Sequence, residues 1–231
     1  MGILERMFQG NPIAQSDNLL LERIIVSKLQ TALSGFLRSD DADKLARLLE
    51  RVVKNGKVSY DEATQMVDGD PEDILILGFG WRLLLPVRAT KTGVDWEDRM
   101  LIPQPGEEYQ MPNVTRHLVE NAQQAGYWDP EKAIVDVFED IGDPDSNKMP
   151  VLVGQMASEV KGRRISGVRI KQMCIELGLG DRVDPLLSEL KACGIMSPKL
   201  TSLTEVSREG SPIYELNPSL LVGGSEITDA E

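Results

Sequence analysis

Apolar side chains return every three or four positions in the first part of the chain. From residue 16 to residue 37 the recurring apolar positions are Leu20, Ile24, Ile25, Leu29, Leu33 and Phe36. This period predicts an α-helix with one buried face. A second helix is predicted from Asp40 or Asp41 to residue 53, where Asn55-Gly56 provides a stop. Residues 1–56 are therefore expected to form an N-terminal helical segment. Its candidate homodimer seam consists of Leu20, Ile24, Leu29 and Leu33.

Residues 57–103 show the signals of a possible winged-helix unit. Ser59 and Glu62 have the spacing of a capping box at the start of a short helix. Asp70 and Pro71 suit the N-cap and the first position of the next helix. The following stretches predict a strand at 81–88, a polar loop at 90–98 and a returning strand at 99–102. Helix, turn, helix, strand, loop, strand is the order of a winged helix.

Residues 104–147 predict a helical connector. Gln104-Pro105-Gly106 interrupts the chain, and helices are then expected over residues 113–125 and from 129 or 130 to 141. The stretch 142–146 is rich in Gly, Pro and Asp, which do not continue a helix. The stretch contains no large apolar side chain that would need to be buried, so it is the best candidate for a domain boundary.

Residues 148–222 carry the clearest pattern. Three helices are predicted, over residues 149–160, 166–177 and 181–193, with Ser166 as an N-cap and Gly194 as a C-terminal stop. Val183, Leu187 and Leu190 place one face of the third helix against the first two. Two strands, at 195–200 and 213–216, flank a polar excursion.

The spacing of several short motifs carries a family resemblance within this segment. The motifs are Leu177-Gly178-Leu179, Val183, Leu187, Leu190, Cys193-Gly194-Ile195-Met196 and Gly210-Ser211-Pro212-Ile213-Tyr214-Glu215-Leu216. Together they resemble the winged helix-turn-helix module of ArsR- and MarR-type bacterial regulators. The resemblance implies that the third helix enters the major groove of DNA. The expected fold class is mainly α with small β wings, as tandem winged-helix units joined by a helical connector.

The net charge of −12 is unevenly distributed. Residues 1–147 hold 15 Lys and Arg against 26 Asp and Glu, or −11, whereas residues 148–222 hold 10 against 8, or +2. Residues 223–231 add three acids and no base, and are expected to form an acidic flexible tail. Only the C-terminal module could approach a polyanion without first overcoming its own charge.

The predicted third helix of that module is nevertheless a poor face for phosphate. Its outward positions are Asp181, Arg182, Asp184, Pro185, Ser188 and Glu189, which is three acids against one base. The basic residues lie mostly before and along the second helix and toward the wing. The candidate nucleic-acid contacts are Lys161, Arg163, Arg164, Arg169, Lys171, Arg182, Lys199 and Arg208. The alternative is a solvated face with scattered ion pairs.

Residue motifs argue against an enzyme. The single histidine, His117, has no nucleophile motif beside it, and Gly78-Phe79-Gly80 lacks the third glycine of a dinucleotide fingerprint. Cys174 and Cys193 lack metal-ligand spacing and fit buried thiols. Asp143-Pro144-Asp145 does not supply a calcium-loop ligand series. No catalytic, cofactor or metal site is predicted. Without a long apolar run or a signal peptide, a cytoplasmic protein with no membrane contact is expected.

Two functions remain open from the sequence. One is DNA binding or transcription regulation through the C-terminal module, with double-stranded DNA as the partner. The other is a non-enzymatic protein–protein interaction adaptor, similar to the acidic, doubly winged ScpB-like partners of chromosome-segregation complexes. The acid-rich third helix favours the second hypothesis, in which the partner is another protein or a second copy bound through the N-terminal helices.

Overall fold

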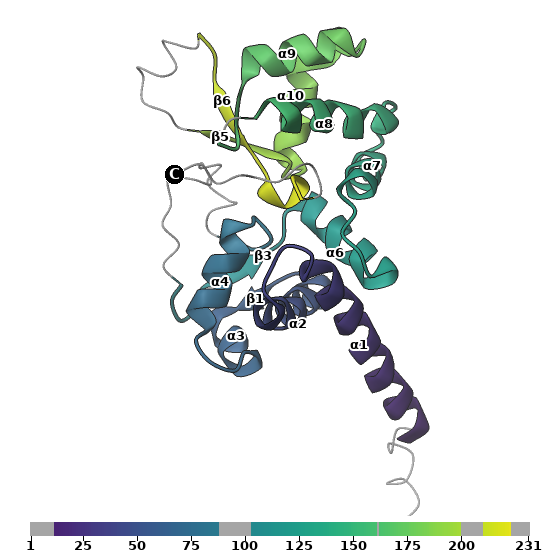
Figure 1. Cartoon of the computed structure of the whole chain (residues 1–231), viewed down its shortest axis with the longest axis vertical. Helices are drawn as coiled ribbons and strands as arrows, with labels where there is room; N and C mark the ends of the chain where they lie inside the picture. Colours follow the sequence, from purple (N-terminus) through teal and green to yellow (C-terminus); the bar gives the residue numbers. More distant parts are fainter. Residues whose placement is uncertain (1–11, 88–102, 161, 200–209, 223–231) are drawn as a thin grey trace, which may run out of the picture.

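The computed structural model describes residues 12–87, 103–160, 162–199 and 210–222, with side chains from residue 20 onward. The chain is mainly helical and contains two small antiparallel sheets of three strands each (Figure 1). The predicted fold class, mainly α with small β elements, is confirmed.

The first sheet belongs to an N-terminal unit that runs from α2 to β3. In order, its elements are α2 (Ser39–Asn55), β1 (Val58–Ser59), α3 (Tyr60–Met66), α4 (Pro71–Gly80), β2 (Leu85–Pro86) and β3 (Glu108–Gln110). The strand order is β1-β3-β2, with Val58 opposite Tyr109 and Leu85 opposite Gln110. Strand β3 is therefore central although it comes last in the sequence.

A C-terminal unit, from α8 to β6, repeats this order. Its elements are α8 (Met149–Glu159), β4 (Arg164–Ser166), α9 (Gly167–Glu176), α10 (Val183–Ala192), β5 (Met196–Lys199) and β6 (Ile213–Leu216). The strand order is β4-β6-β5, so the last strand is again central. Short 3-10 turns at Ser146–Lys148, Gly180–Arg182 and Pro218–Leu220 complete this part of the chain.

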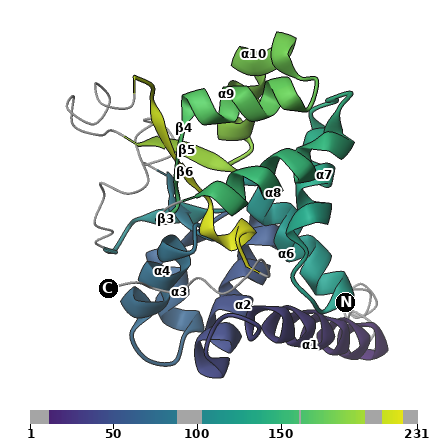
Figure 2. The same ribbon diagram turned by 45° about the horizontal axis from the view of Figure 1, so that its top comes forward.

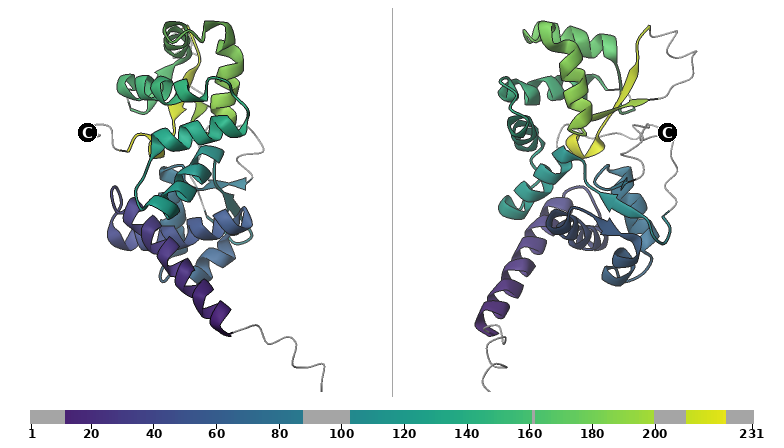
Figure 3. Two further views of the ribbon diagram at one scale, coloured as in Figure 1. Left: turned by 90° about the vertical axis from the view of Figure 1, so that its right-hand side faces the viewer. Right: turned by 180° about the vertical axis from the view of Figure 1, so that it is seen from behind.

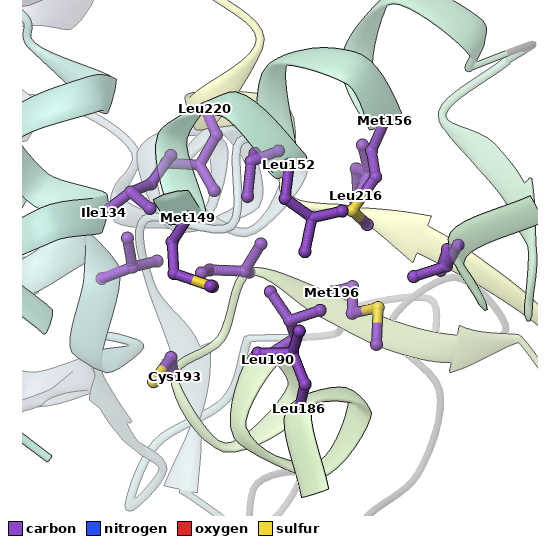
Figure 4. Packing of buried hydrophobic residues seen from close by; sticks show 14 of the residues in the cluster. Ile134, Met149, Leu152, Met156, Leu186, Leu190, Cys193, Met196, Leu216 and Leu220 are labelled. Carbon is purple, nitrogen blue, oxygen red and sulfur yellow. The ribbon is translucent and has the colours of Figure 1, made fainter. Parts of the chain in front are cut away.

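Buried apolar side chains from every layer of the C-terminal unit form one core (Figure 4). The side chains labelled in the figure are Ile134, Met149, Leu152, Met156, Leu186, Leu190, Cys193, Met196, Leu216 and Leu220. Ile134 comes from α7 (Pro130–Asp140), so the connector contributes to this core. The sheet and the three helices of the unit are held by the same set of aliphatic contacts.

Helix α6 (Asn113–Ala125) lies between the two units and belongs to both cores (Figure 3, left). Val114 and Leu118 are buried in the C-terminal core, whereas Val119 and Ala122 are buried in the N-terminal one. One helix can serve two cores because residues three or four positions apart, such as Val114 and Leu118, share a face, whereas adjacent residues, such as Leu118 and Val119, project from different faces. The predicted connector is thus an integral part of the packing.

The local capping signals in the sequence are confirmed. The Ser59 side chain accepts from the backbone N–H of Glu62, and the Glu62 carboxylate accepts from the backbone N–H of Ser59. Asp70 caps α4, with Pro71 in its first turn, and Ser166 caps α9. Each cap satisfies amides that the first helical turn leaves without a partner.

The predicted strand at 81–88 is mostly wrong. After α4 the backbone N–H groups of Leu83 and Leu84 both donate to the carbonyl oxygen of Gly78, so the chain turns, and only Leu85–Pro86 are extended. The apolar residues of this run are buried, but the backbone forms a turn. The periodicity of a short apolar run does not distinguish a buried turn from a buried strand. Strands β1, β3 and β4 were not expected, and the predicted strand 99–102 lies outside the described residues.

Helix α1 (Pro12–Leu33) packs its second half on the body, and its first half projects from it (Figures 1 and 2). Leu29 and Leu33 are fully buried in the N-terminal core. Leu20 is 63% exposed and Ile24 is 47% exposed. The four residues of the predicted dimer seam therefore lie in two different environments, and the two buried leucines have no surface to offer a second copy.

Candidate functional site

The helix-turn-helix of the N-terminal unit presents a strongly acidic surface. Five exposed carboxylates lie on or between α3 and α4, and we call this set the acidic face: Asp61, Asp68, Asp70, Glu72 and Asp73. No Lys or Arg occurs from Val58 to Trp81. Ile76 of α4 adds an apolar side chain to this surface, since the residue is 46% exposed.

Caps and burial explain why these acids point outward. Ile74, Leu75, Gly78 and Phe79 turn one side of α4 into the core, which leaves Glu72, Asp73 and Ile76 on the opposite side. Glu62 is the acid of this segment that turns back toward the body. It accepts from the Ser59 backbone N–H and binds Arg51 at 2.9 Å, and these bonds hold the pKa of its carboxyl below the ordinary value.

In the C-terminal unit the equivalent third helix, α10, begins with a carboxylate–arginine cluster. The Arg182 guanidinium donates to Asp143 at 3.0 and 2.6 Å, to Asp145 at 2.9 Å and to Glu189 at 3.4 Å. The Asp143 side chain is 1% exposed, and its hydrogen bonds to Arg182 lower the pKa of its carboxyl. Burial raises the pKa of the Glu189 carboxyl, as does the nearby charge of Asp143. Arg182 thus serves an internal cluster.

This cluster changes the interpretation of residues 142–146. The sequence suggested an exposed boundary, yet Asp143 is buried and accepts hydrogen bonds from the backbone N–H of Asp145 and from Arg182. The segment is therefore attached to the start of α10. The sequence contains no signal for this contact, because the cation that allows Asp143 to be buried, Arg182, lies 39 positions away in sequence.

The structure divides the eight predicted nucleic-acid contacts into groups. Arg182 is engaged as described, and Arg169 is held by Glu159, with Glu176 at 3.8 Å. Arg163, Arg164 and Lys171 are exposed. Lys199 at the end of β5 is half-buried, and Lys161 and Arg208 lie outside the described residues. Of these three exposed residues, Arg163 also donates a hydrogen bond to the Gly80 carbonyl oxygen at 3.5 Å.

Other chemistry-bearing side chains have structural surroundings. His117 of α6 lies 3.1 Å from Asp140 of α7, and Cys174 and Cys193 are buried. Burial raises the pKa of both thiols, and that of Cys193 reaches about 11 with the help of the Glu189 charge. Within the described ranges no group of three or more His, Cys, Asp or Glu side chains is placed to hold a metal ion.

The chain belongs to a protein family whose model matches residues 27–224. The description of the family names no activity. No curated protein and no solved structure matches the chain. The match runs from α1 past the C-terminal unit, so the family is defined by both units and their connector together. In the part of the chain that the structure describes, every helix is too short or too polar to cross a lipid bilayer.

Proposed function

We propose that this member of the family is a non-enzymatic adaptor of the cytoplasm, which binds a positively charged segment of another protein through its acidic face. The observation behind the proposal is the helix-turn-helix surface of the N-terminal unit. Five exposed carboxylates and the exposed Ile76 occupy the place where a DNA-binding winged helix needs Lys and Arg side chains.

Electrostatics favours a cationic partner over nucleic acid at this surface. Two like charges 4 Å apart repel by about 1 kcal/mol in water, and by more where water is excluded. The segment from Val58 to Trp81 has no Lys or Arg of its own, and Lys44 of α2, whose Nζ lies 3.7 Å from a Cβ built on Gly69, offsets only part of the five negative charges. A basic segment would be attracted to these carboxylates by a Coulomb energy of the same size. Charge complementarity of this kind mainly raises the association rate and the specificity of binding.

The C-terminal unit supports the same conclusion. Asp181 and Asp184 are exposed at the start of its third helix, and the one base among them, Arg182, is bound by three carboxylates. Freeing Arg182 for a phosphate would leave Asp143 buried without its cation, which is a costly state for a carboxylate. Neither third helix therefore presents an uncommitted arginine or lysine on its first turns.

Affinity capture from an extract of the source cells tests the proposal with matched variants. The test variant, Glu72→Lys with Asp73→Lys, reverses two exposed first-turn charges of α4. The control, Glu131→Lys with Glu139→Lys, reverses two exposed charges on α7. We expect one protein to be retained in stoichiometric amount by the wild type and the control, to be lost from the test variant and to elute at high salt. Equal retention by all three chains, or no stoichiometric protein at all, would overturn the proposal.

DNA binding by the C-terminal unit is the second candidate, and the exposure of Arg163, Arg164 and Lys171 favours it. Three phosphate contacts predict a slope of about −3 in a plot of log affinity against log salt. Fluorescence anisotropy with a random-sequence duplex measures this slope directly. Absence of binding at low salt would remove the DNA hypothesis without affecting the adaptor.

A further inference from the structure

We infer that the two winged-helix units act as one preset platform, whose relative orientation is fixed by a buried polar latch. The latch consists of Arg82 and Thr115 from the N-terminal side and Glu215 and Asn217 from the C-terminal unit. This inference goes beyond the proposed function and does not rest on it, because it concerns geometry that any partner of the two units would meet.

Arg82 and Glu215 form the centre of the latch. The Arg82 guanidinium lies 3.2 and 3.3 Å from the two carboxylate oxygens of Glu215, although 133 positions separate the residues in sequence. Their side chains are 6% and 3% exposed. Two charges with so little access to water must stay together, since separating them inside the junction leaves each one buried without its partner.

The backbone around Arg82 is shaped for this role. Arg82 has a φ of +54°, a conformation that costs energy for any residue other than glycine. It is held by a bond from its guanidinium to the Phe79 carbonyl oxygen at 2.8 Å, and the guanidinium lies 4.5 Å from the centroid of the Phe79 ring. The side chain is thereby aimed at β6 of the other unit.

Thr115 and Asn217 extend the latch along α6. The Thr115 hydroxyl donates to the Arg82 carbonyl oxygen at 3.2 Å, and the Asn217 amide reaches the Thr115 hydroxyl at 3.5 Å and the Gly194 carbonyl oxygen at 3.1 Å. All of these side chains are buried. Hydrogen bonds have narrow angular tolerance, so a connected set of them specifies one orientation where apolar contacts alone would allow several.

Two further contacts cross the junction away from the latch. The carbonyl oxygen of Cys193, the residue that follows α10, accepts from the Val114 backbone N–H at 2.9 Å, and that of Ala192, the last residue of α10, accepts from the Asn113 side chain at 3.4 Å. The C-terminal end of α10 thus meets the N-terminal end of α6, an alignment that the helix dipoles favour. Together with α6, which both cores share, these contacts hold the units close together, and the latch selects one orientation among those that close packing allows.

Double electron–electron resonance on the full chain tests the inference. Spin labels at Gln65→Cys on α3 and Lys191→Cys on α10 occupy exposed positions, whereas both native thiols are buried. We expect one narrow distance distribution in the otherwise unmodified chain. In the Glu215→Ala and Arg82→Gly variants, the distance distribution should no longer show a single narrow peak. Glycine accepts a φ of +54° without strain, so any change in that variant reports the missing guanidinium.

A matched control removes an ion pair within one unit. Glu159→Ala breaks the exposed contact with Arg169 and should leave the distance distribution unchanged. Circular dichroism verifies that each variant keeps its helical content. A broad distribution in the unmodified chain, or a narrow and unshifted one in both latch variants, would overturn the inference.

Discussion

Gly194 tests how tightly the two units are packed, because a methyl group at this position has no room. The backbone φ of Gly194 is +78°, and a Cβ atom built there would lie 2.4 Å from the Cβ of Pro112 and 3.4 Å from its Cα. Pro112 immediately precedes α6, so the clash falls on the helix that both cores share. Gly194→Ala is therefore expected to destabilise the junction as well as the end of α10.

Gly178 supplies the matched control. It follows α9 as Gly194 follows α10 and has a φ of +72°, but nothing lies within 4 Å of its built Cβ. Alanine in the left-handed region costs about 1–2 kcal/mol at either site. Overpacking against Pro112 adds about 1–3 kcal/mol at Gly194 alone. Because 1 kcal/mol shifts the Tm of a protein of this size by roughly 2–4 °C, Gly194→Ala should melt roughly 2–12 °C below Gly178→Ala.

Thermal unfolding followed by circular dichroism measures both melting temperatures, and urea titration gives the corresponding free energies of unfolding. Repeating Gly194→Ala in a Pro112→Gly background removes the clashing Cβ. The additional loss should then shrink toward the cost seen for Gly178→Ala. Equal melting temperatures for the two single variants would show that Pro112 moves aside at no cost, and the reasoning from close packing would fail.

Three further predictions concern single side chains. The pKa of the Asp143 carboxyl is lower in the folded protein than in the unfolded chain. Its bond to Arg182 therefore stabilises the protein fully at pH values above the pKa of the unfolded chain, and this stabilisation is lost as the pH falls through the pKa of the folded protein. The difference in unfolding free energy between wild type and Asp143→Asn should thus be constant above about pH 5 and shrink below about pH 4, with urea titrations across that range as the measurement. Ser59→Ala removes the capping box of α3 and should cost about 1 kcal/mol, whereas no change on urea titration would contradict the cap. Cys174 and Cys193 should resist a thiol reagent in the native protein at pH 8, since burial raises the pKa of both, and rapid labelling without denaturant would disprove their burial.

The sequence by itself determined the features that depend on neighbouring residues. The Ser59 and Glu62 capping box and the Asp70-Pro71 start of α4 follow from contacts within a few residues. The approximate positions of the helices follow in the same way, although α1 spans Pro12–Leu33 and not residues 16–37. The charge of the acidic face can also be read from the sequence, since the run from Val58 to Trp81 holds six acids and no base, but the sequence reasoning did not single out this run.

Only the tertiary structure decided the features that join distant segments. Periodicity did not separate Leu29, which is buried against the body, from Leu20, which projects, because both lie on helical spacing and differ only in what covers them. Arg182 looked like a phosphate contact until the fold brought Asp143 to it, and Arg82 and Glu215 meet across 133 positions. A sequence pattern reports the preferences of a local segment, whereas the burial of a charge depends on whether an opposite charge arrives from elsewhere in the chain.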